Sequence, residues 1–196
     1  MAVDTKNLMR LRDITGAGIN DCKLALDESG SDIDKAIEIL RKKGALKAAK
    51  KSAERTAGQG LIESYIHAGG TVGVLLKILC ETDFVARTDE FKQLAHDIAM
   101  QVAAGDPSYL KPADVPEAEI AKEKEIYTEQ LKAEGKPANV IEKIMTGKLD
   151  KYFEQVCLLK QPFVKDDSLT IEKLIDQKIA KIGEKIEVVS FVRYQI

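Results

Sequence analysis

The spacing of apolar residues changes along this chain, and that change restricts the fold more than any other feature. The spacing is helical over residues 1–45, becomes two from Gly60 to Glu81, and is helical again after Thr88. The last residues, "EKIEVVSFVRYQI", return to a spacing of two. Helices repeat every 3.6 residues and half-buried strands every two. The chain therefore predicts an α+β fold, with a three-stranded antiparallel sheet covered by helices.

The first 45 residues predict three short helices. Leu8 and Leu11 provide an apolar face for the first of them. The third helix begins after Ser31 or Asp32, either of which can cap it. We expect this helix to end at Gly44, because glycine readily adopts the left-handed conformation that closes a helix.

Residues 41–55, "RKKGALKAAKKSAER", carry seven basic side chains and one acid in a sequence rich enough in alanine to be helical. Two interpretations stay open, a solvated linker helix or a contact surface for nucleic acid or an acidic protein. No aromatic residue stands between the charges to stack on bases, which favours the linker. We expect one domain over residues 1–55 and a second, α+β domain over residues 56–196.

The stretch "GLIESYIHAGGTVGVLLKILCE" predicts a β-hairpin that turns at "HAGG". In its second strand, Val74, Leu76 and Ile78 share one face, and Leu75 lies on the other. A helix capped by Thr88 follows, and its apolar stripe is suited to cover the sheet.

A helical insertion is expected at about residues 112–160. Its helices run from Glu117 to about Leu159, and "EGKP" predicts a sharp turn within them. Pro137 is suited to the first position of the next helix. The insertion therefore predicts two or three antiparallel helices that project from the core.

Charge and motifs exclude several classes of protein. Thirty Lys and Arg balance 32 Asp and Glu, so no global field attracts nucleic acid or a membrane. The three cysteines lack zinc-site spacing, and phosphate-loop, HExxH and GxSxG motifs are missing. The chain shows neither a signal peptide nor a membrane span. We expect a cytoplasmic protein without a metal or cofactor.

The segment "CETDFVARTDEF" places one aromatic residue, Phe84, in the turn after a strand. The ring could be exposed, or it could fold back under the next helix as part of the core. Cys80, Glu81 and Asp83 also leave open a small thiol or carboxylate enzyme, although catalysis by a thiol needs a nearby base. His67, in the hairpin turn, could be a solvated loop residue.

Several strings together resemble the elongation factor Ts family in order and spacing across nearly the whole chain. They are "LRDITGAGINDCKLALDESGSDIDKAIEILRKKGALKAAKK", "YIHAGGTVGVLL", "CETDFVA", "GKP", "QPFVKDD" and "IGEKIEVVSFVRY". The resemblance implies a guanine nucleotide exchange factor, and no enzyme, that binds elongation factor Tu in its GDP-bound and nucleotide-free forms. It also accounts for the missing phosphate loop, since nucleotide and magnesium belong to the partner.

The resemblance assigns the central role to Thr82, Asp83, Phe84 and Val85. In the family, the phenylalanine of this loop wedges into the partner's GTP-binding domain, and the adjacent acid takes part in contacts that dislodge magnesium. The loop is thus the expected site of magnesium dislocation and partner binding.

Further partner contacts are implied at Ile19 and Lys23, within "TGAGINDCK", and at His67. By the same resemblance, the three-helix unit looks like a ubiquitin-associated-type domain, and the helical insertion like a coiled-coil element. The chain carries the core pattern once, as in the short form of the family, so two chains could pair. No cysteine lies in the last strand, which makes such a homodimer non-covalent. Direct contact with nucleic acid or a membrane is not expected.

Overall fold

The computed structural model describes residues 5–196, apart from the side chains of residues 45 and 47–54. The contacts of the chain form two compact units. Unit 1 comprises Met1–Leu61, Ile78–Lys92 and Lys173–Val189, and unit 2 comprises Ile62–Lys77, Gln93–Glu172 and Ser190–Ile196. The proposed domain division at residue 55 stays a prediction. Three lysines of the basic stretch, Lys47, Lys50 and Lys51, have side chains outside the described residues.

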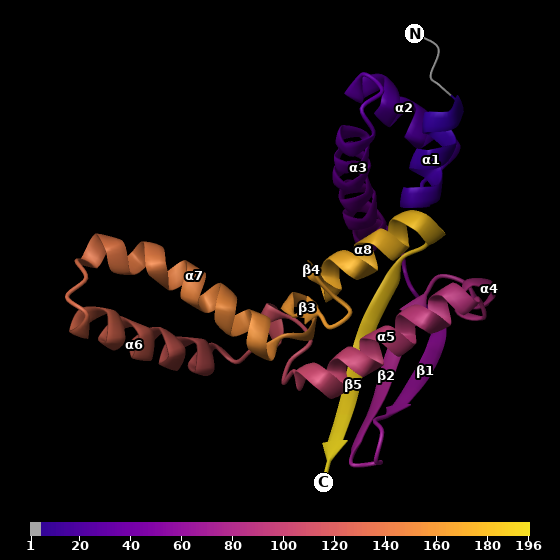
Figure 1. The fold of residues 1–196 in the computed structure, drawn as a ribbon. Helices are drawn as coiled ribbons and strands as arrows, with labels where there is room; N and C mark the ends of the chain where they lie inside the picture. Colours follow the sequence, from indigo (N-terminus) through magenta and orange to yellow (C-terminus); the bar gives the residue numbers. More distant parts are fainter. Residues whose placement is uncertain (1–4) are drawn as a thin grey trace. The chain divides into compact units, whose positions relative to one another are not determined.

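Three helices open unit 1, as the sequence predicts: α1 (Thr5–Thr15), α2 (Ile19–Ser29) and α3 (Ile33–Glu54) (Figure 1). The glycine after α2, Gly30, closes it in the left-handed conformation, with φ 66°. Asp32 caps α3, because its Oδ1 accepts a hydrogen bond of 3.1 Å from Lys35 N. The helices share a small core of buried residues: Leu11, Cys22, Ala25, Leu26, Ala36 and Leu40.

The prediction that α3 ends at Gly44 is wrong. Helix α3 continues to Glu54, and Gly44 is not among the glycines with positive φ. Its role is steric, because a Cβ at this position would lie 3.4 Å from Ala180 Cβ of helix α8 (Ile171–Ile182). The missing side chain thus lets two helices of unit 1 approach closely, and no helix stop is needed there.

The sheet has the predicted three strands, in the order β1 (Gln59–Ile66), β2 (Val72–Cys80) and β5 (Ile186–Gln195). Neighbouring strands are antiparallel (Figure 1). The alternation in β2 is confirmed, because Val74, Leu76 and Ile78 are buried whereas Leu75 is half exposed.

Helix α5 (Asp89–Gly105) packs against this sheet within unit 2. His96 Nδ1 lies 3.1 Å from Glu63 Oε1 of β1, and Arg193 Nε of β5 donates a hydrogen bond of 3.3 Å to Ala103 O. Thr88 caps the helix as predicted, because its Oγ1 accepts a hydrogen bond of 3.3 Å from Phe91 N in the first turn. Its apolar stripe is buried throughout: Phe91, Leu94, Ala95, Ile98, Ala99 and Val102.

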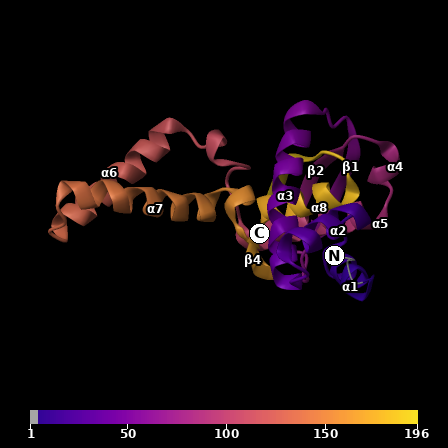
Figure 2. The same ribbon diagram turned by 90° about the horizontal axis from the view of Figure 1, so that it is seen from above.

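The insertion consists of two antiparallel helices, α6 (Glu117–Ala133) and α7 (Ala138–Val156), with a 3-10 turn before them (Pro112–Asp114) and one after (Leu158–Lys160) (Figure 2). The helical hairpin is confirmed, but one detail is wrong. Pro137 occupies the N-cap of α7, with ψ 153°, one position before the predicted site. The extended ψ lets the chain enter the helix from a turn that Gly135 makes at φ 73°.

The segment after the insertion forms a small additional hairpin, β3 (Pro162–Phe163) and β4 (Asp166–Thr170), that the sequence analysis missed. A buried pair of amides anchors it to α5. Gln101 Nε2 donates to Gln161 Oε1 at 3.0 Å, and Gln101 Oε1 accepts from Val164 N at 2.8 Å. Strands this short give no alternation, so their pattern carries no signal.

Candidate functional site

A four-residue helix, α4 (Asp83–Ala86), follows strand β2 in unit 1. Thr82 has extended backbone angles and caps the helix, its Oγ1 accepting from Val85 N at 3.3 Å. The thiol of Cys80, the last residue of β2, donates to Thr82 O at 3.1 Å. The strand end, the cap and the helix are therefore joined by side-chain hydrogen bonds, as well as by the chain.

Phe84 is exposed, whereas its neighbours in α4 are buried. Its relative exposure is 78%, against 8% for Val85 and 8% for Ala86. The interpretation of Phe84 as part of the core is therefore wrong. An exposed aromatic ring on a fixed backbone is typical of a residue that another molecule buries.

Asp83 pairs with a residue of its own segment. Its Oδ2 lies 2.8 Å from Arg87 Nη2, and both side chains are well exposed. Exposed pairs of this kind contribute about 0–1 kcal/mol. The carboxylate can therefore change partners at little cost.

Two glutamates join this loop to the turn between α8 and β5. Glu184 accepts hydrogen bonds from the backbone and hydroxyl of Thr82, and Glu81 accepts one of 2.6 Å from Lys185 N. Sequence reasoning missed the role of Glu184. The string "GEKI" contributed to the family resemblance, but nothing in it indicates a partner 102 residues away.

Cys80 is buried, and burial raises the pKa of its thiol, with the negative charge of Glu184 adding to the effect. The reactive form of cysteine is the thiolate, which a raised pKa disfavours. The thiol also serves as a hydrogen-bond donor to the loop. Its surroundings are those of a structural cysteine, and they speak against a thiol enzyme.

The other predicted contacts of unit 1 lie on helix α2. Ile19 is half exposed, and Lys23 is exposed. The loop "TGAG" that precedes them includes Gly16, with φ 64°, and the side chain of Lys181 from α8 packs against it. The contact with Lys181 of α8 thus holds the loop in place. The side chains of Ile19 and Lys23, the predicted partner contacts, remain accessible.

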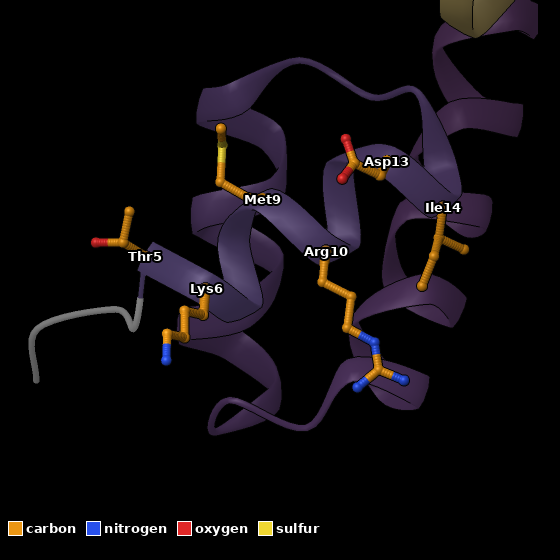
Figure 3. Close-up of a pocket in the computed structure, with 6 residues that line it drawn as sticks. All are labelled: Thr5, Lys6, Met9, Arg10, Asp13 and Ile14. Atoms are coloured by element: carbon orange, nitrogen blue, oxygen red, sulfur yellow. The ribbon is translucent and has the colours of Figure 1, made fainter.

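Helix α1 has an accessible apolar face of its own, which sequence reasoning missed. A shallow pocket on α1 is lined by Thr5, Lys6, Met9, Arg10, Asp13 and Ile14 (Figure 3). Met9 and Ile14 are both more than half exposed. Both lie outside the predicted apolar face of Leu8 and Leu11, so a helical pattern that marks the core does not find them.

His67 belongs to unit 2 and is exposed in the hairpin turn. Its Nδ1 lies 3.1 Å from Tyr65 Oη, and Tyr65 also meets the ring of His96 edge-on, at 5.5 Å between centroids. The two histidines of the chain are therefore held by one tyrosine of β1. His67 is accessible for a contact, and its ring is oriented by a neighbour.

Other kinds of site find little support in the described part of the chain. Among the described side chains, those of residues 5–44, 46 and 55–196, no three His, Cys, Asp or Glu form a cluster suited to a metal ion. Within the same residues, no helix is both long and apolar enough to cross a membrane. The segment around Phe84 is accordingly the strongest candidate site.

Comparison with known proteins finds relatives that match nearly the whole chain. A family described as "Elongation factor TS" matches residues 22–196. The chain is 54% identical over 194 residues to "Elongation factor Ts" of Carboxydothermus hydrogenoformans, covering 99% of this chain and 89% of that one. It is 55% identical over 196 residues to the protein of the same name from Thermotoga petrophila, covering 100% of this chain and 97% of the relative. For Thermotoga maritima the identity is 54%, with the same coverage.

Proposed function

The chain belongs to the elongation factor Ts family, the nucleotide exchange factors of elongation factor Tu, and from this premise we propose that it promotes GDP release by inserting the Thr82–Val85 loop and dislodging the partner's magnesium ion. One observation carries the proposal. Phe84 is 78% exposed on a helix whose next residue, Val85, is buried. The fold therefore presents a large apolar ring that it does not use for its own core.

The exchange follows from thermodynamic linkage. The factor and the nucleotide each weaken the binding of the other by the same coupling free energy. In the partner, magnesium bridges and neutralises phosphate oxygens, and backbone amides cradle them. A ring wedged beside these groups disturbs both, so GDP leaves from a ternary complex. The factor need not distinguish GDP from GTP, because the more abundant nucleotide then occupies the empty site.

The four loop residues have different parts in this proposal. Phe84 is the wedge. Asp83 leaves Arg87 and enters the contacts that displace magnesium, a change that the exposure of this ion pair makes inexpensive. Thr82 and Val85 hold the loop in place, the first as helix cap and the second as a buried anchor.

Docking outside the loop is assigned to Ile19 and Lys23 of α2 and to His67 of the hairpin turn. The accessibility of all three side chains supports this assignment. Such contacts are made in both the GDP-bound and the nucleotide-free complex. They supply affinity that does not depend on Phe84, and so keep the factor bound while the nucleotide is exchanged.

We also infer a non-covalent homodimer through the sheet face opposite α5. In unit 2 this face exposes Ile62, Ile66, Leu75, Val192 and Tyr194. Ile66, Leu75 and Tyr194 line a common shallow pocket, so the exposed side chains gather in one place. Exposed apolar patches of this kind mark interaction surfaces, and a second copy of the chain offers a matching one.

The test of the central proposal is the release of fluorescent GDP from purified elongation factor Tu, with and without this protein. Substoichiometric amounts of the chain should accelerate release, because one factor molecule serves many partners in turn. An unchanged release rate would overturn the proposed function. Chelation of magnesium by EDTA provides a reference, since it removes the ion without the wedge.

A further inference from the structure

Glu184 lies in the turn between α8 and β5, and its carboxylate binds the residues that lead into α4. Oε2 accepts from Glu81 N at 3.2 Å and from Thr82 N at 3.0 Å. Oε1 accepts from Thr82 Oγ1 at 2.7 Å. Hydrogen bonds to an ionised acceptor are roughly twice as strong as neutral ones. One side chain thus holds the two consecutive residues, Glu81 and Thr82, that immediately precede helix α4.

Glu81, in the segment before α4, binds in turn to the backbone of the turn between α8 and β5. Glu81 Oε1 accepts from Lys185 N at 2.6 Å and from Arg55 Nη1 at 3.1 Å. The same guanidinium donates to Gly183 O at 3.3 Å. Each of the two turns therefore carries a carboxylate that binds the backbone of the other. All of these residues belong to unit 1.

This arrangement determines where Phe84 points. A helix of four residues is too short to be stable by itself, so its direction depends on how the chain enters it. The hydrogen bonds of Glu184 hold the entry at Thr82, which has φ −121° and ψ 152°. Val85, the residue after Phe84, is buried and anchors the backbone on the other side of position 84. A loop ordered before docking loses less conformational entropy when it is bound.

We propose that Glu184 is a positioning residue for nucleotide exchange, which holds the backbone of Glu81 and Thr82 so that Phe84 is presented in one orientation. The inference rests on the proposed function and adds to it a residue outside the docking loop. Glu184 acts through Thr82 and does not itself enter the partner. Its removal should slow GDP release at saturating factor, while docking through Ile19 and Lys23 is retained.

The orientation of the loop can be measured without the partner. The chain contains no tryptophan, so Phe84→Trp introduces a single fluorescent reporter at the site. Glu184→Ala in this background should increase the amplitude of fast motion in the time-resolved anisotropy of Trp. The matched control is Glu187→Ala, at an exposed glutamate three residues further on, which should leave the decay unchanged. An identical decay with and without Glu184 would overturn the positioning role.

The effect on exchange is tested by combining Glu184→Ala with Phe84→Ala. If Glu184 acts through the ring, its single substitution slows release at saturation by roughly 10-fold or more. In the Phe84→Ala background the same substitution then changes little. A purely structural role would instead give equal losses in both backgrounds, and that result contradicts the inference. Thr82→Val, which retains both backbone donors, should show a smaller loss than Glu184→Ala.

The two proposals fail in different ways. If Phe84→Ala alone leaves GDP release unchanged, the wedge is wrong, whatever Glu184 does. If Phe84→Ala abolishes acceleration but Glu184→Ala does not alter it, the positioning role alone is wrong. Circular dichroism and thermal unfolding of each variant establish that the compared proteins are folded.

Discussion

The side chain of Lys181 packs against Gly16, so closely that a Cβ at Gly16 would lie 3.0 Å from Lys181 Cε. The ammonium group of the same lysine lies 2.7 Å from Glu90 Oε1. One side chain of α8 therefore contacts both the loop between α1 and α2 and the first turn of α5. Within unit 1, the predicted docking loop is held by the same helix that precedes Glu184.

Gly16→Ala should destabilise the protein for two reasons. Its φ of 64° costs an L-residue about 1–2 kcal/mol, and moving Lys181 away weakens an ion pair worth up to ~1 kcal/mol. The control is Gly30→Ala, at φ 66°, where a Cβ would have no atom within 4 Å apart from those of its own residue and chain neighbours. Urea unfolding should show the larger loss for Gly16→Ala. Equal losses would mean that the Lys181 contact contributes nothing.

Phe84→Ala should leave stability almost unchanged and slow GDP release by ~30-fold, the equivalent of the ~2 kcal/mol typical of an aromatic hot spot. The exposure of 78% is the reason for the first expectation. Phe91→Ala is the matched truncation in the core, and it should lower the free energy of unfolding by about 3–5 kcal/mol. Thermal unfolding and fluorescent GDP release measure the two effects. A large loss of stability in Phe84→Ala would contradict its placement.

The contribution of Glu90 should depend on pH. Burial by itself would raise the pKa of this carboxyl, but the ammonium groups of Lys178 and Lys181 outweigh it and hold the pKa below its usual 4.5. A lowered folded pKa gives stabilisation that is present above pH 4.5 and lost as the pH falls through the folded value. Glu90→Gln should therefore reduce stability near neutral pH by about 0.5–1 kcal/mol. In urea titrations the difference from the parent should shrink below pH 4.5. A difference that persists at lower pH would contradict the mechanism.

Gln161→Ala should destabilise unit 2 more than an exposed truncation does. Gln161 Nε2 donates to Gly105 O at 2.9 Å and to Gln155 O at 3.1 Å, and its Oε1 accepts from buried Gln101. Each buried polar group left without a partner costs about 1–3 kcal/mol. The control is Gln93→Ala at an exposed position of α5, where we expect less than about 0.5 kcal/mol. Similar losses in both variants would show that water replaces the amide network.

The dimer inferred above should separate when charge is placed on the sheet face. Sedimentation equilibrium should give twice the chain mass of 21.6 kDa for the parent and a value near the single chain for Leu75→Glu. Two carboxylates facing each other across a symmetric interface are unfavourable. Val164→Glu, at an exposed apolar position outside the sheet, should leave the mass unchanged. A monomeric parent protein would refute the dimer directly.

Periodicity and capping residues predicted most of the fold correctly, because these signals are local. Thr88 starts α5 as expected, and the hairpin turns at "HAGG". The misses at Gly44 and at β3–β4 have different causes, since β3 and β4 are too short to show an alternating pattern, whereas the role of Gly44 depends on a distant part of the chain. Whether a glycine ends a helix or makes room for one depends on its neighbour, here Ala180, which is 136 residues away.

The candidate site likewise contains residues that the sequence predicted and residues that it could not predict. The sequence pattern left open whether Phe84 is exposed or part of the core. The family resemblance predicted an exposed ring that contacts the partner. Its exposure and the capping by Thr82 are now observed. Glu184 could not be predicted, because a hydrogen bond across 102 residues leaves no trace in local spacing. Met9 and Ile14 were missed because apolar periodicity selects the buried face of a helix.

In α4, Val85 is buried and belongs to the fold, whereas Phe84 is exposed and is the residue to which we assign nucleotide exchange. A polar residue at position 84 would leave the core intact and the α2 contacts available. If the proposed roles of Phe84 and of the α2 contacts hold, such a chain would bind elongation factor Tu without emptying its nucleotide site. It would behave as a competitive inhibitor of the intact factor, so a single substitution on this surface could interfere dominantly when both forms share one cell.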